Sequence, residues 1–281
     1  MPVANPAVSE LPPVASASAG SRRARVLIIG NEKGGSGKST VAMHLVVGFL
    51  RAGFKVGSLD LDVRQASLTR YLENRAAFAA GRGVPLPMPT HRRGPNPVAA
   101  ADVAGQVGGL IDGSDIVVVD TPGRVDDVSM AIHVLADVIV TPVGESHLDL
   151  DLIGNLDRRQ GRAVRPGPYA EFVWSVRQQR ARAGLAPAEW FVCHNRRRQP
   201  ETRVGREVTR TLADLSSRFA FRLVPGFSER TIFQEMFPDG LTLLDLREAE
   251  TGVGLTLSHV AARTEIRRLV DALSPAASVS P

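Results

Sequence analysis

The pattern of apolar and polar residues along the chain predicts strands that alternate with helices. Short apolar runs rich in β-branched residues predict buried strands, and longer segments with apolar residues near a 3.6-residue period predict helices. The predicted strands cover residues 26–29, 55–59, 115–119, 138–140, 190–193 and 221–224. The predicted helices cover residues 41–50, 66–80, 98–110, 148–156, 169–183, 201–219 and 257–273.

This alternation predicts the α/β class, with a mostly parallel, twisted sheet covered by helices on both faces, in three layers. Residues 81–97, which are rich in glycine, proline, arginine and histidine, are expected to form an irregular connection. Alanine, proline and serine dominate both ends of the chain, which predicts disordered tails at residues 1–22 and 275–281. We therefore expect one domain over residues 23–274.

A glycine-rich segment connects the first predicted strand to the first predicted helix. It reads Lys33-Gly34-Gly35-Ser36-Gly37-Lys38-Ser39-Thr40. In this context the glycines let backbone N–H groups approach an anion, and the helix N-terminus adds positive charge. Lys38 would then contact the β- and γ-phosphates of a nucleotide, and the Ser39 hydroxyl would bind Mg²⁺. The segment predicts a P-loop NTPase fold; the alternative is a glycine-rich turn with incidental lysines.

The use of lysine supports the phosphate site. The chain contains 34 lysine and arginine residues, but lysine occurs only at positions 33, 38 and 55. Two of the few lysines therefore lie in this one loop. A planar guanidinium cannot replace a compact ammonium group inside a phosphate-binding loop, which favours the functional interpretation.

Carboxylates follow two of the predicted strands. Asp60 and Asp62 come just after residues 55–59, and Asp120 follows residues 115–119. Ligands bind at the carboxyl ends of the strands in an open α/β sheet, so these side chains are expected at the binding edge. Apolar residues ending in Asp120 have the form of a Walker B segment, whose carboxylate holds Mg²⁺ directly or through water. The alternative is that all three are plain carboxylates in turns.

Positive charge is concentrated in one part of the chain. The net charge is +5, and the window from Arg196 to Arg230 contains nine arginines against four acidic residues, an excess equal to that of the whole chain. This predicts a face that binds a polyanion, with non-specific DNA binding through phosphates. The alternative is a solvated helix face. The candidate DNA contacts are Arg196, Arg197, Arg198, Arg203, Arg206, Arg210, Arg222 and Arg230.

Other sequence features exclude or disfavour several classes of protein. The single cysteine, Cys193, rules out an intramolecular disulfide and suits a reducing compartment. No apolar run approaches the roughly twenty residues that a membrane span needs, and no secretory signal is recognised, so we expect a cytoplasmic protein. The guanine-reading pattern N-K-x-D is absent from the sequence, which favours ATP over GTP.

The glycine-rich loop, with its early lysine, resembles the deviant Walker A motif of the ParA/MinD superfamily of P-loop ATPases. Further segments resemble the MipZ family of division-site regulators more closely than ParA or MinD. These segments are residues 30–33, 60–65, 71–75 and 237–246. The likeness extends from about residue 25 to residue 270, with a poorly matched part at residues 81–110 and partial agreement in the arginine-rich window.

This resemblance implies roles for the residues of the site. The catalytic residues would be Lys33, Lys38 and Asp62, with Lys33 crossing a dimer interface to the partner's nucleotide and Asp62 positioning the attacking water. The Mg²⁺ site would be formed by Ser39, Asp60 and Asp120. The ATP contacts would come from residues 33–40, from Asn195 at the adenine edge and from Pro225 near the base.

For the whole protein, the resemblance implies a nucleotide switch. ATP would join two copies, and the homodimer would bind DNA non-specifically on the nucleoid, inhibit FtsZ assembly and be recruited by ParB. A ParA-type partition ATPase, which moves DNA without contacting FtsZ, is the alternative. A MinD-type membrane switch is less favoured, because the residues after Leu273 do not form a basic amphipathic helix. The iron–sulfur branch of the superfamily is disfavoured by the single cysteine.

Overall fold

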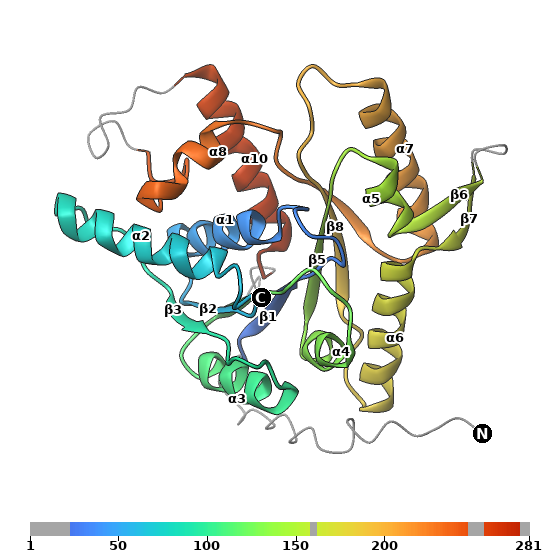
Figure 1. Cartoon of the computed structure of the whole chain (residues 1–281), viewed down its shortest axis with the longest axis horizontal. Helices are drawn as coiled ribbons and strands as arrows, with labels where there is room; N and C mark the ends of the chain where they lie inside the picture. Colours follow the sequence, from blue (N-terminus) through green and yellow to red (C-terminus); the bar gives the residue numbers. More distant parts are fainter. Residues whose placement is uncertain (1–22, 158–161, 247–255, 276–281) are drawn as a thin grey trace, which may run out of the picture.

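A seven-stranded sheet forms the centre of the computed structural model, which describes residues 23–157, 162–246 and 256–275 (Figure 1). Its strands are β1 (Arg25–Ile29), β2 (Val56–Asp60), β3 (Thr90–Arg93), β4 (Ile116–Asp120), β5 (Val138–Val143), β8 (Glu189–His194) and β9 (Arg222–Pro225). Their order is β3-β2-β4-β1-β5-β8-β9, and every neighbouring pair is parallel. The predicted α/β class and parallel sheet are confirmed.

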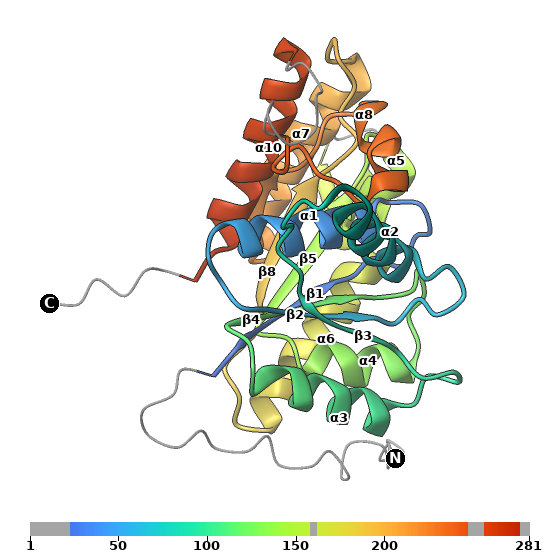
Figure 2. The ribbon, with the colours of Figure 1, turned by 90° about the vertical axis from the view of Figure 1, so that its left-hand side faces the viewer.

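Helices cover both faces of this sheet. They are α1 (Lys38–Arg51), α2 (Ser67–Arg82), α3 (Ala100–Ile111), α4 (Asp127–Val134), α5 (His147–Asp151), α6 (Pro168–Arg182), α7 (Arg203–Arg218), α8 (Ile232–Glu235) and α10 (Leu257–Leu273), with a short 3₁₀ turn, η2 (Phe237–Asp239). Figure 2 shows α1, α2 and α10 on one side of the sheet and α3, α4 and α6 on the other.

The central strands read as continuous apolar runs because both of their faces are buried. In β1, Leu27 and Ile29 pack into the core under α1 and α10, whereas Val26 and Ile28 pack into the core on the opposite face. Successive side chains of a strand point to opposite faces, so this alternation follows from the backbone. Parallel pairing of β4 with β1 and β2 places the carboxyl ends of these three strands side by side.

One predicted helix is wrong in part. The segment predicted as a helix over residues 148–156 contains the short helix α5, which ends at Asp151, and then β6 (Gly154–Asp157), which pairs antiparallel with β7 (Arg162–Pro166). Gly154 lies against α7, where a Cβ would come 2.9 Å from the Leu215 side chain. The backbone at Gly154 thus packs closely against α7, and the chain forms β6 here instead of the helix that its apolar residues predicted.

Besides β6 and β7, the elements β3, α4, α8 and η2 were not predicted. Strand β3 lies inside residues 81–97, which we expected to be irregular, and α4 follows β4. The β3 sequence, Thr-His-Arg-Arg, carries no apolar run because it is an edge strand with half-exposed and exposed side chains. Helix α4 is short, and its start is set by Asp126, whose side chain accepts a hydrogen bond from the Ser129 N–H.

The predicted tails, residues 1–22 and 275–281, lie outside the described residues except for Pro275, so their disorder and the domain bounds stay predictions. None of the helices in the described part of the chain has both the length and the apolar character that crossing a membrane requires.

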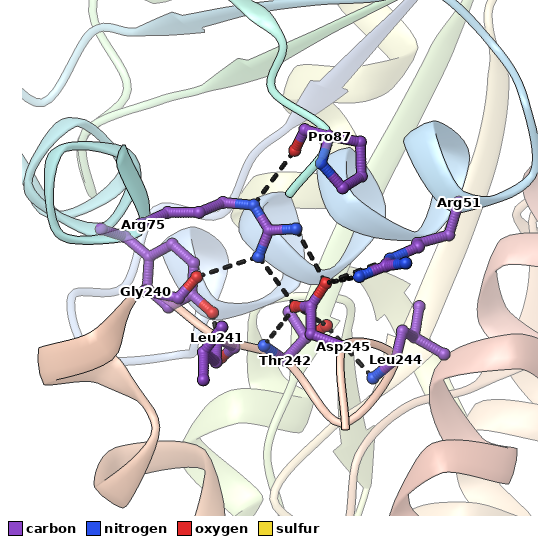
Figure 3. Close-up of polar contacts among 9 residues, drawn as sticks. Arg51, Arg75, Pro87, Gly240, Leu241, Thr242, Leu244 and Asp245 are labelled. Carbon is purple, nitrogen blue, oxygen red and sulfur yellow. Dashed lines mark hydrogen bonds and ion pairs between the residues drawn. The ribbon is translucent and has the colours of Figure 1, made fainter. Parts of the chain in front are cut away.

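A buried ion pair ties α2 to the segment that follows η2 (Figure 3). The guanidinium of Arg75 donates to both carboxylate oxygens of Asp245, at 2.8 and 2.7 Å, and neither residue has measurable solvent exposure. Arg51 of α1 donates to the same carboxylate at 2.8 Å, and the backbone N–H and hydroxyl of Thr242 donate to its other oxygen. The carboxylate is therefore fully surrounded by donors.

The backbone around this ion pair is equally close. Gly240 has a φ of 60°, and a Cβ there would lie 2.1 Å from the backbone nitrogen of Arg75. The Tyr71 hydroxyl donates to the Leu241 carbonyl. The two segments at residues 71–75 and 237–246, which were singled out separately in the sequence, thus pack directly against each other.

Candidate nucleotide-binding site

The glycine-rich loop lies between the end of β1 and the start of α1, as predicted (Figure 1). Gly35 and Gly37 have φ values of 75° and 91°, in the left-handed region that glycine adopts without strain. Gly37 is the residue that precedes α1, so the N–H groups at the helix start remain available for an anion.

Lys38, the first residue of α1, is buried within this loop. Its ammonium group donates a hydrogen bond to the Lys33 carbonyl at 2.9 Å. Burial lowers the pKa of Lys38, and the carboxylates of Asp120 and Asp62 oppose that shift. These two carboxylates therefore lie near enough to act on the charge that Lys38 brings to the phosphate site.

Asp120, the last residue of β4, is completely buried and unpaired. Neither carboxylate oxygen accepts a hydrogen bond of ordinary geometry from the described residues, although the Ser39 hydroxyl lies close enough to stabilise the charged form. Burial raises the pKa of Asp120 to about 7, while the nearby hydroxyl of Ser39 and ammonium of Lys38 act in the opposite direction. An unpaired carboxylate in the interior is costly unless a ligand compensates it.

The donors around Asp120 fit Mg²⁺. Strand register places Asp60 and Asp120 opposite each other at the ends of β2 and β4, and Ser39 lies close to Asp120. Across the described residues there is no cluster of three or more His, Cys, Asp and Glu side chains that could enclose a metal ion. A small set of oxygen donors suits Mg²⁺, which retains waters and takes its remaining ligands from phosphates.

Asp60 differs from Asp120 because the protein already holds it. One carboxylate oxygen accepts from the Asp62 N–H at 3.1 Å, and the other accepts from the N–H and the hydroxyl of Thr69 at 2.9 and 3.0 Å. Burial raises the pKa of Asp60, and the bonds from Thr69 oppose the shift. These bonds fix the carboxylate in one orientation at the strand end.

Asp62 lies in the turn after β2 and is half-exposed. Its carboxylate accepts a hydrogen bond from the Gln65 N–H at 3.3 Å, and its charge acts on Lys38. The structure therefore brings the predicted catalytic carboxylate to the predicted phosphate site.

Lys33 lies at the surface and pairs with α5. Its ammonium group is 2.9 Å from the carboxylate of Asp149, and its side chain is 41% exposed. The loop before it is held by Asn31, which donates to the Pro142 carbonyl and accepts from the Lys33 N–H. Lys33 is thus kept beside its own phosphate loop by a carboxylate from another element.

Asn195 braces the glycine-rich loop. Its side chain donates to the Ser36 carbonyl at 3.1 Å and accepts from the Phe227 N–H at 3.3 Å. A Cβ at Gly37 would lie 2.3 Å from the Asn195 nitrogen. The adenine contact of Asn195 stays a prediction. Pro225 is exposed at the end of β9, and its contact with the base also stays a prediction.

The structure divides the predicted DNA contacts into two groups. Arg203, Arg206 and Arg210 are exposed on α7, and within the described part of the chain none of them forms an ion pair. Their opposite helix face, with Val208, is buried in the core. We call these three arginines the α7 arginines.

Most of the remaining arginines have acidic partners, so they do not form one uninterrupted basic face. The pairs are Arg197 and Arg230 with Glu265, Arg198 with Glu229, and Arg222 with Glu189. Arg196 is exposed and has a positive φ of 52°. Whether any arginine of the window contacts DNA stays a prediction.

Sequence reasoning missed several residues that shape the site. Asn31 and Asp149 hold Lys33, Thr69 holds Asp60, and Gly123 packs against the glycine-rich loop, where a Cβ would come 3.0 Å from the Gly34 nitrogen. Asn31 lies in a segment that carried the family likeness. The other contacts join residues at least nine positions apart, and no local motif marks them.

Comparison with known proteins gives a family. The family model described as ATPase MipZ matches residues 25–277. A curated relative, the cytosolic Fe–S cluster assembly factor CFD1 of Kluyveromyces lactis, is 37% identical over 68 residues, which make up 23% of this chain. The chain spans about a quarter of that relative's length, 24%.

Solved structures share the fold. Apo McdA of Cyanothece matches with a TM-score of 0.60 at 15% identity, over 89% of this chain and 99% of that one. MinD of Pyrococcus horikoshii OT3, complexed with Mg-ADP, has a TM-score of 0.56 at 16% identity, over 89% and 97%. A putative plasmid partition protein of Borrelia burgdorferi B31, bound to AMPPNP, has a TM-score of 0.53 at 15% identity, over 89% and 100%. At these identities the likeness shows the fold alone.

Proposed function

This chain belongs to the MipZ family of ATPases, and we propose that it is an ATP-dependent switch that dimerises, binds DNA and regulates the placement of the division site. The observation that carries the proposal is the buried, unpaired Asp120 beside Ser39 and Lys38 at the glycine-rich loop. A carboxylate kept without a protein partner at a phosphate site fits a nucleotide that arrives with Mg²⁺.

The residues of the site would divide the work of phosphoryl transfer, which needs mainly positioning and neutralisation of charge. The loop N–H groups and Lys38 would bind the phosphates, and Mg²⁺, when bound, would neutralise charge on them. Asp60 is already fixed by Thr69. This leaves Asp62, half-exposed in the next turn, to position the attacking water.

The position of Lys33 supports a dimer. Lys33 pairs with Asp149 at the surface, and the neighbouring side chain of Leu148 is 72% exposed. A lysine in this position can leave Asp149 and reach the nucleotide of a second copy. Contact between the copies would also cover the exposed Leu148, which favours association.

The α7 arginines support DNA binding. Arg203, Arg206 and Arg210 lie three or four residues apart on one exposed helix face. Contacts of this kind bind phosphates without reading sequence, and the affinity falls steeply with salt concentration. Binding of the nucleoid in the cell is proposed on the same ground. Inhibition of FtsZ assembly and recruitment by ParB are proposed from membership of the family.

Two alternatives come from the superfamily. A partition ATPase would bind DNA in the same way and leave FtsZ untouched. A membrane switch needs a free amphipathic helix near the C-terminus. Helix α10 is poorly suited to that role, because Ile266, Leu269 and Leu273 are fully buried in the core. An iron–sulfur function is disfavoured by Cys193, which is buried and whose pKa burial raises to about 12.

ATP hydrolysis by the wild type, Asp62→Ala and Asp112→Ala tests the enzymatic part of the proposal. Asp62→Ala should bind ATP with nearly unchanged affinity and hydrolyse it about a hundredfold more slowly. Asp112 is an exposed carboxylate in the turn after α3, so its variant serves as the matched control. Wild-type turnover in Asp62→Ala would contradict the assigned role.

DNA binding and FtsZ sedimentation test the cellular part. The ATP-locked Asp62→Ala form should bind DNA and reduce FtsZ polymer. A triple variant with alanine at 203, 206 and 210 should lose most of its DNA affinity and much of its salt dependence. Alanine at the exposed arginines 70, 82 and 182 provides a charge-matched control. DNA binding with untouched FtsZ would support the partition ATPase instead.

A further inference from the structure

A chain of hydrogen bonds leads from the edge strand β3 to Asp60. His91 of β3 lies between β2 and α2, with Nδ1 2.9 Å from the Ser58 hydroxyl and Nε2 3.0 Å from the Thr69 hydroxyl. The Thr69 hydroxyl in turn donates to the Asp60 carboxylate at 3.0 Å. The roles proposed above for the site do not use His91 or Ser58.

The direction of this chain follows from the number of protons available. The Thr69 hydroxyl has one proton and gives it to Asp60, so its oxygen can only accept from His91 Nε2–H. Nδ1 of the same neutral ring then carries a lone pair and accepts from the Ser58 hydroxyl. Every donor in the chain is therefore directed toward the Asp60 carboxylate.

The side chain of His91 is not needed to hold β3 in the sheet. Backbone pairing joins β3 to β2 along its whole length. Arg92 also donates to the carbonyls of Gln106 and Gly109 on α3, and Arg93 donates to the Val63 carbonyl. These contacts hold β3 in the sheet without the His91 ring, so its two hydrogen bonds call for another explanation.

We propose that His91 is a positioning residue, which holds the Thr69 hydroxyl toward Asp60 and thereby fixes that carboxylate for Mg²⁺–nucleotide binding. The inference rests on the proposed ATPase function. Residues that orient metal-binding carboxylates and histidines from outside commonly change metal affinity or activity by ten- to a hundredfold when they are replaced. His91 acts through Thr69 and does not contact the nucleotide.

The test compares His91→Phe, His91→Gln and the exposed Thr90→Ala as a control on the same strand. His91→Phe should lower kcat/KM for ATP about tenfold and raise the Mg²⁺ concentration needed for half-maximal activity. The amide of His91→Gln can donate to Thr69, so this variant should recover most of the activity. Equal loss in both variants, or no loss in either, would overturn the inference.

A readout without catalysis is the tautomer of His91, observed by ¹⁵N NMR of the protein without nucleotide. We expect the proton on Nε2, and a shift of this signal in Thr69→Val; a proton on Nδ1 would overturn the inference. The Mg²⁺-dependent rise in melting temperature with ADP should likewise shrink in His91→Phe and return in His91→Gln. If the wild type hydrolyses ATP and these signals do not change, only the role of His91 fails. If the wild type does not hydrolyse ATP, the proposed function itself fails.

Discussion

Asp120 and Asp245 are both completely buried aspartates, yet their surroundings are opposite. Asp245 accepts hydrogen bonds from two arginines and from Thr242, whereas neither oxygen of Asp120 accepts one from the described residues. The two pKa values follow. Burial alone would raise the pKa of Asp245, but the Arg75 guanidinium holds it below its usual value; burial raises that of Asp120 to about 7.

Asp245 represents buried carboxylates that stabilise the fold, and Asp120 represents buried carboxylates whose compensating partner is a ligand. A buried charge with all its partners fixes one arrangement of the chain, and removing a partner is costly because the other charge stays buried. A buried carboxylate without partners costs stability in the free protein. Such a group is explained by a bound state in which the compensating charge is present.

The largest expected effect is on stability, at the Asp245 end of the comparison. Asp245→Ala leaves Arg75 buried without its carboxylate and should lower the free energy of unfolding by about 3–5 kcal/mol. Urea unfolding followed by circular dichroism measures this, with the exposed Asp239→Ala as the control. A decrease of less than about 1 kcal/mol in the free energy of unfolding would show that Asp245 does not stabilise the fold more than Asp120 does.

The second effect is a pH dependence that Asp120 alone should cause. Its pKa is about 7 in the folded state against 3.8 in the reference state, so between these values the folded protein keeps a proton that the unfolded chain releases. The contribution of Asp120 therefore favours the folded state at low pH and is lost as the pH rises through 7, by roughly 4 kcal/mol at most.

Asp120→Asn removes this dependence. Without nucleotide, the variant should be more stable than the wild type at pH 8, and the difference should fade as the pH is lowered toward 4. Urea unfolding at several pH values measures both proteins. A variant that is less stable than the wild type at pH 8 would show that Asp120 holds the fold as Asp245 does.

The smallest effect is expected at the pair of Lys33 and Asp149, in which Asp149 is buried and Lys33 is partly exposed. Its ammonium and carboxylate groups are 2.9 Å apart, but the Lys33 side chain is 41% exposed, so solvent screens the pair. Asp149→Asn should change the free energy of unfolding by less than about 1 kcal/mol. The same variant frees Lys33, so dimerisation with ATP, measured by light scattering, should be retained. A large loss of stability would place this pair with Arg75 and Asp245.

The sequence predicted the parts of the molecule whose physics is local. Buried strands such as β4 and β5 can be recognised as apolar runs. The loop from Lys33 to Thr40 can be recognised by its glycines, two of which adopt positive φ. Strand β3 was missed because an edge strand needs no apolar face. The turn at Gly154 was missed because its cause is the approach of α7.

The contrast between the two buried aspartates could be predicted only in part. Asp120 ends a predicted strand and was marked as a Walker B carboxylate, but no local pattern shows that Asp245 is paired with arginines. Asp245 pairs with Arg75, which is 170 positions away in the sequence. Asp60 is connected to His91 through the Thr69 hydroxyl. Which carboxylate is neutralised by the protein, and which is left for a ligand, is decided by tertiary contacts.

The role of Asp120 in binding Mg²⁺ and nucleotide can be tested by thermal unfolding of the wild type and Asp120→Asn, each with ADP in EDTA and with ADP and Mg²⁺. ADP avoids turnover during the measurement. At a hundredfold excess over its dissociation constant, Mg²⁺–ADP should stabilise the wild type by about 2.7 kcal/mol. We expect Asp120→Asn to fold but to lose the part of this stabilisation that depends on Mg²⁺. An equal response to Mg²⁺ in both proteins would contradict this expectation.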